Sequence, residues 1–114
     1  MTTTGVQAVY LETHNWGQAA RFFQSLGFQL EFETDHNSGQ LRHSRGPCVF
    51  IAEVPANKDP EMKLALGVTS VDGFEPGPGV EVVTPFEDTH WGTKLMTVRD
   101  PDGRLWSIEG RASR

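Results

Sequence analysis

The feature that most constrains the fold is a predicted β-hairpin near the end of the chain. Two apolar, β-competent stretches, 94–98 (KLMTV) and 105–108 (LWSI), flank the sequence DPDG at positions 100–103. Pro101 sets φ for the first central position of a turn, and Gly103 supplies the residue with positive φ that closes the turn. Because such a turn fixes the register of both strands, it also decides which side chains face inward.

Length and composition favour one globular domain over residues 1–114. The opening sequence MTTTGVQ has neither the charge nor the apolar run of a signal peptide, and no apolar run approaches the roughly 18 residues of a membrane span. A single cysteine, Cys48, lies in an apolar stretch and fits a reducing cytoplasm. The net charge of −5 argues against nucleic acid and anionic membranes as partners.

The first half of the chain predicts a helix that follows a strand. Residues 6–13 have the β-branched and aromatic content of a strand, and Asn15 is suited to cap a helix that follows. Gly27 ends the helix, since glycine adopts the left-handed conformation easily. The apolar face of this helix is predicted to consist of Trp16, Ala19, Ala20, Phe23 and Leu26.

Three more strands complete this half. Residues 28–33 (FQLEFE) alternate, which predicts a half-buried strand with Phe28, Leu30 and Phe32 on one face. A short polar strand over 40–44 and a buried strand over 48–54 follow. The predicted order is therefore β-α-β-β-β.

The second half repeats this pattern without its helix. A linker over 55–61 separates module one (5–54) from module two (62–110). The stretch 70–79 (SVDGFEPGPG) holds three glycines and two prolines, which cannot form a helix. We therefore expect an uncovered apolar face, partly shielded by Phe74 and otherwise by a second copy of the chain. That face is predicted to carry Leu64, Leu66 and Val68.

Two such modules with a WG…VRDPDGxxWxI ending resemble the vicinal-oxygen-chelate superfamily, which includes glyoxalase I, extradiol dioxygenases and bleomycin-resistance proteins. The stretches YLETHNWGQAARFFQSLGF, GPCVFIAEV and HWGTKLMTVRDPDGRLWSIEG carry the likeness, which covers nearly the whole chain. KLALGVTSVDG and the Trp-Gly pair at 91–92 are most similar to the bleomycin-resistance type. The resemblance implies an α+β fold of two tandem βαβββ modules with curled mixed sheets around a cleft, and a homodimer that sequesters a drug.

The resemblance also implies where a metal would bind. The matching positions are Gln7, about Ile51, Lys63 and Ser107, of which only Gln7 is an acceptable ligand. We therefore predict no metal and no cofactor, with a divalent metal as the alternative. A shift of two residues along the strands gives the alternative ligand set Gln7, Glu53 and Glu109.

The predicted pocket has an apolar floor and aromatic residues at its rim. On the side of the strands that binds ligands in the family, alternation places an apolar floor of Val9, Leu11, Val49 and Ile51. Glu87 and Asp88, next to Trp91, favour a cationic ligand. Two residues keep an alternative: Phe32 as core, and Trp91 as a cap on the core. His43 and His90 are placed to approach one another across the cleft. The predicted ligand-binding residues are Gln7, Leu11, Phe32, Ile51, Lys63, Phe86, His90, Trp91 and Ser107.

These residues predict a non-enzymatic, cytoplasmic small-molecule-binding protein that sequesters an antibiotic-like aromatic or cationic ligand. Nucleophile elbows, P-loops and dinucleotide-binding motifs are absent from the sequence. The first alternative is a divalent-metal-dependent enzyme of the glyoxalase or dioxygenase type. The second is an interaction module whose cavity is filled by its own side chains.

Overall fold

The computed structural model describes residues 2–89 and 92–112, and the chain divides into two compact units. One unit is residues 8–63, and the other combines residues 1–7 with 64–114. The stretch 55–61, expected as a linker, belongs to the first unit. Its ends are bonded to the first strand, through Val54 N to Thr13 O (2.8 Å) and Glu12 N to Glu61 O (2.9 Å).

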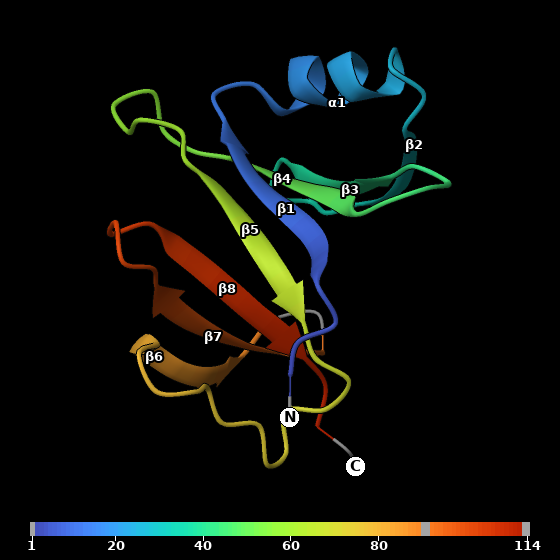
Figure 1. Ribbon diagram of the computed structural model, residues 1–114. Helices are drawn as coiled ribbons and strands as arrows, with labels where there is room; N and C mark the ends of the chain where they lie inside the picture. The colour runs from blue at the N-terminus through green and yellow to red at the C-terminus, as the bar shows by residue number, and fades with distance from the viewer. Residues whose placement is uncertain (1, 90–91, 113–114) are drawn as a thin grey trace. The chain divides into compact units, whose positions relative to one another are not determined.

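The unit 8–63 is a four-stranded mixed sheet with a helix on one face (Figure 1). Its strand order is β2-β3-β4-β1, in which β1 and β4 are parallel and the other neighbours are antiparallel. The elements are β1 (Val6–Thr13), α1 (Trp16–Gln24), β2 (Gln29–Glu33), β3 (Ser38–Arg42) and β4 (Cys48–Glu53).

Helix α1 begins where the sequence predicts but ends two residues earlier than predicted. The Asn15 side chain accepts a hydrogen bond from Gln18 N (3.0 Å), and Gly27 has φ +99° in the turn that follows. Four of the five predicted apolar positions pack on the core of Leu41, Val49 and Ile51. The prediction for Leu26 is wrong: the helix ends at Gln24, and the Leu26 side chain is 58% exposed.

A β-bulge in β2 overturns the predicted alternation of its apolar residues. Leu30 pairs with the fully buried Leu41, while Phe32 pairs with Gln40, and the register shifts between Leu30 and Phe32. Because a bulge adds one residue to a strand, the side chains beyond it change face. Phe32 therefore points away from α1 rather than into the core beneath it.

The second unit repeats the same sheet topology without a helix in its described residues. Its order is β5-β8-β7-β6, with β5 and β8 parallel. The stretch 70–79, which we call the link, packs Val71 and Phe74 against the sheet. The chain itself therefore covers the face that was expected to need a second copy. The strands are β5 (Met62–Gly67), β6 (Glu81–Asp88), β7 (Lys94–Arg99) and β8 (Leu105–Gly110).

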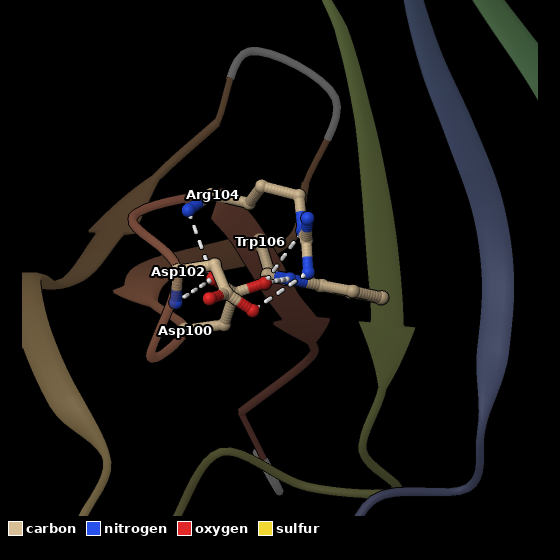
Figure 2. Close-up of polar contacts among 4 residues, drawn as sticks. All are labelled: Asp100, Asp102, Arg104 and Trp106. Atoms are coloured by element: carbon tan, nitrogen blue, oxygen red, sulfur yellow. Dashed lines mark hydrogen bonds and ion pairs between the residues drawn. The ribbon is translucent and has the colours of Figure 1, made fainter.

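The predicted hairpin is confirmed. Strands β7 and β8 pair from Lys94–Gly110 to Arg99–Leu105, and Gly103 closes the turn with φ +88°. Asp100 lies at the centre of the polar contacts in this turn (Figure 2).

The predicted α+β class is confirmed: the described chain is mostly β with one short helix. None of its described helices is long and apolar enough to cross a membrane.

Candidate ligand-binding face

Three aromatic rings form a row on the face of the first unit that α1 does not cover. The Tyr10 and Phe50 rings are stacked with centroids 6.2 Å apart and planes 13° apart. The Phe32 ring lies 6.2 Å from Phe50 at 50°. Strand pairing produces this row, because Phe32, Gln40, Phe50 and Tyr10 are lateral neighbours across β2, β3, β4 and β1. We call Tyr10, Phe50 and Phe32 the aromatic row.

A lysine stands at one end of the row. Lys63 Nζ lies 6.0 Å from the centroid of the Tyr10 ring, within the range of a cation–π contact. Its side chain is half-buried. The row therefore combines three neighbouring aromatic rings with a positive charge over its Tyr10 end.

The carboxylate next to this end already has its own partners. Glu12 accepts hydrogen bonds from Lys58 Nζ, from Glu61 N (3.1 Å) and from the Tyr10 hydroxyl (3.4 Å). Burial alone would raise the pKa of Glu12, but the bonds from Lys58 and Glu61 lower it below its ordinary value. Burial, together with the Glu12 charge, raises the pKa of Tyr10, so its hydroxyl is a donor at neutral pH.

The other end of the row is bordered by a second compensated charge. Glu31 accepts hydrogen bonds from Arg42 Nε (2.9 Å) and Gln40 Nε2 (2.6 Å), and these bonds lower its pKa. The same pair lines a surface pocket of about 270 Å³ beside the β2–β3 hairpin. That pocket offers paired charges, and it contains none of the residues predicted to bind a ligand. Its lining is Gly27, Gln29, Leu30, Glu31, Arg42, His43 and Ser44.

All four predicted floor residues of this unit face the other way. Val49 and Ile51 are buried in the core beneath α1, and Val9 and Leu11 pack against the same core. The prediction that they line the ligand side is corrected, because α1 covers their face of the sheet. The opposite face of these strands carries Tyr10 and Phe50, one position away, which the sequence reasoning missed. The apolar face of the helix could have predicted this arrangement. That face must pack on the aliphatic side of β1, which leaves Tyr10 on the side that the helix does not cover.

The predicted residues of the second unit lie in different surroundings. Phe86 is half-buried and packs against the core next to Phe74, with ring centroids 6.1 Å apart. Ser107 is buried, and its strand neighbours are Ala65 and Thr97. His90 and Trp91 lie outside the described residues.

Gln7 and Glu109, two members of the alternative metal-ligand set, meet in the second unit. Gln7 Nε2 donates to Glu109 Oε1 (3.2 Å), and Thr93 Oγ1 donates to Glu109 Oε2 (2.7 Å). The third member, Glu53, holds the start of α1 instead, because its Oε2 accepts from Trp16 N (2.8 Å). Across residues 2–89 and 92–112, no three His, Cys, Asp or Glu side chains gather as a metal site requires.

The described residues therefore do not fit a metal in the predicted manner. Both oxygens of the Glu109 carboxylate accept hydrogen bonds from side chains, and Gln7 points a donor toward it rather than a ligand oxygen. His43, which was expected to approach His90 across the cleft, lies beside Phe28 with ring centroids 5.3 Å apart. No reaction step is assigned to a metal at these residues.

Comparisons by sequence find no matching family model and no matching curated protein. Comparison of structures finds methylmalonyl-CoA epimerase from Mycobacterium tuberculosis, with a TM-score of 0.78 and 16% identity over 96% of this chain and 89% of that one. A glyoxalase/bleomycin resistance protein/dioxygenase superfamily member from Vibrio splendidus 12B01 has a TM-score of 0.65 and 17% identity, covering 92% of this chain and 98% of that one.

A third similar structure is the Mn(II)-bound glyoxalase from Novosphingobium aromaticivorans. Its TM-score is 0.62 at 15% identity, over 98% of this chain and 42% of that one. At these identities the likeness establishes the fold, which is the one seen in structures of the glyoxalase/bleomycin resistance/dioxygenase superfamily.

Proposed function

We propose that this chain, which has the fold of that superfamily, binds a small aromatic molecule on the aromatic row and does not convert it. The observation that carries the proposal is the row itself, with successive ring centroids 6.2 Å apart on a sheet face that α1 leaves uncovered. Phe32 at its end is 40% exposed. The Tyr10 and Phe50 rings are half-buried. Aromatic rings gathered on one face are typical of a binding surface when part of their area remains in water, because a flat ligand can stack on them.

The finer version of the proposal is sequestration of an antibiotic-like compound by a cytoplasmic homodimer. Leu66 and Val68 do not supply the dimer interface, because the link packs over them within the same chain. Other apolar side chains are exposed and available for it, most clearly along the β6 edge of the second unit. These are Val80, Val82 and Val83, each between 41% and 42% exposed.

A metal-dependent enzyme is the second candidate. The proximity of Gln7 and Glu109 within one unit is the observation on its side, since both residue types serve as metal ligands, although the bond between them turns the amide donor of Gln7 inward. Two of the similar structures are named as enzymes, an epimerase and a glyoxalase. Against it, Glu53 is occupied at the start of α1.

The proposal predicts that Phe32→Ala weakens binding of 2-naphthamide, a flat neutral probe. Loss of one stacking ring should raise the dissociation constant about 3- to 10-fold, the equivalent of about 0.5–1.5 kcal/mol. Amide chemical-shift changes on titration would measure the constant. Phe22→Ala is the matched control, because Phe22 is 59% exposed on α1 and contacts Phe23 rather than the row.

Equal affinities for the wild type and Phe32→Ala would contradict the proposal. So would a probe whose shifts map to residues outside β1, β2, β3 and β4. Failure of 2-naphthamide to bind the wild type at millimolar concentration would favour the interaction module, whose apolar surfaces serve a protein partner.

A further inference from the structure

We infer that the ligand of the aromatic row is an anion, a flat aromatic ring bearing a carboxylate or similar group that pairs with Lys63. This inference rests on the proposed function and adds the charge of the ligand to it. It replaces the expectation of a cationic ligand, which was based on Glu87 and Asp88. In the structure Asp88 already has a cationic partner, because it pairs with Lys94 (2.7 Å).

The first argument is the pairing of charges around the row. Glu12 and Glu61 both lie within ion-pair distance of Lys58, and Glu31 pairs with Arg42. Within the part of the chain that the structure describes, Lys63 has no carboxylate within 4.0 Å. Lys58 therefore serves two carboxylates, and Lys63 is the cation at the Tyr10 end of the row that no described carboxylate pairs with.

The second argument is the position of the ammonium group. Lys63 Nζ lies at the Tyr10 end of the row, 6.0 Å from the Tyr10 centroid, and its side chain is half-buried. A ring bound along Phe32 and Phe50 would carry a substituent toward this nitrogen, which lies over the neighbouring Tyr10 ring. A partly desolvated ammonium gains more from an anion than a fully hydrated one does, because the local dielectric constant is lower.

The third argument concerns the carboxylate that would oppose an anion. Glu12 is the acidic group bonded to Tyr10, and its side chain is only 11% exposed. Its charge is balanced by Lys58 and by the Glu61 amide. An anionic substituent at Lys63 therefore meets a compensated carboxylate rather than a bare one.

The test compares three probes with one ring system and three charges: 2-naphthoate, 2-naphthamide and 2-naphthylmethylammonium. Titration followed by amide shifts gives each dissociation constant at low salt, with Tm measured for every variant. We expect 2-naphthoate to bind the wild type at least about 10-fold more tightly than 2-naphthamide, the size of a charge-assisted hydrogen bond. In Lys63→Met this ratio should fall to about 1 while 2-naphthamide binding stays within about 2-fold.

Arg99→Gln is the matched control for net charge, because it removes one positive charge from an ion pair in the second unit. It should preserve the preference for 2-naphthoate. Equal binding of the three probes to the wild type, or a preference that survives in Lys63→Met, would overturn the inference and leave the aromatic row intact. Tightest binding of the ammonium probe would overturn it in favour of a cationic ligand. Absence of binding by all three would overturn both this inference and the proposed function.

Discussion

At the scale of single residues, Asp100 shows how much one carboxylate can organise. Its side chain accepts hydrogen bonds from Trp106 Nε1 (2.9 Å), Arg104 Nε (3.0 Å) and the backbone amides of Asp102 (3.0 Å) and Arg104 (2.9 Å) (Figure 2). The indole donor and these further bonds lower the pKa of Asp100 to about 2. The turn between β7 and β8 is therefore held from inside by an ionised group.

The stability of the protein should fall in acid partly because of this residue. The pKa of Asp100 is lowered from 3.8 to about 2 in the folded state, so its contribution is complete above about pH 4 and is lost as pH falls toward 2. Urea denaturation between pH 2 and 6 should show this decline, and Asp100→Asn should make it shallower while lowering stability at pH 7.

Asp102→Asn is the matched control for that change. Its carboxylate makes one exposed ion pair with Arg104 (3.2 Å), and its side chain is 76% exposed. Its free energy of unfolding at pH 7 should stay within about 0.5 kcal/mol of the wild type. An Asp100→Asn variant with the wild-type acid profile would show that the turn contributes nothing to the pH dependence.

Single residues also show where sequence reasoning reaches its limit. The DPDG turn could be predicted because proline and glycine restrict the backbone locally. The bond from Trp106 to Asp100 could not be predicted, because it depends on where two strands bring two side chains.

At the scale of elements, helix α1 depends on its amino-terminal cap. Asn15→Ala removes the bond to Gln18 N and should lower the free energy of unfolding by about 1 kcal/mol. Asn15→Asp keeps an acceptor and should stay close to the wild type. Thermal or urea denaturation measures both. An unchanged stability in Asn15→Ala would mean that the bond from Trp16 N to Glu53 holds the helix start by itself.

Strand β2 is the element for which the sequence pattern misled. Its alternation predicts Phe28, Leu30 and Phe32 on one face, and that prediction assumes an unbroken strand. Pairing with β3 introduces a bulge, which sends Phe32 to the face opposite Leu30. The bulge depends on the register of two strands, which a single strand's sequence does not encode.

At the scale of the whole molecule, metal content separates the two candidate functions. We expect protein purified without chelator to contain less than one equivalent of divalent metal by elemental analysis. The reason is that Glu53 is bonded to the start of α1 and Glu109 accepts bonds from Gln7 and Thr93. Stoichiometric nickel, zinc, manganese or iron, lost in Glu109→Gln, would support the enzyme instead.

The sequence by itself determined the elements of this protein: a capped helix, a glycine- and proline-rich link that cannot be helical, and a hairpin with fixed register. These follow from local backbone preferences, which neighbouring residues impose. Only the tertiary structure decided which face of the sheet the helix covers, because α1 packs on Leu11 and Ile51 and leaves Tyr10 and Phe50 on the other side. A strand's alternation divides its residues into two faces, but only packing against another element decides which of them is buried.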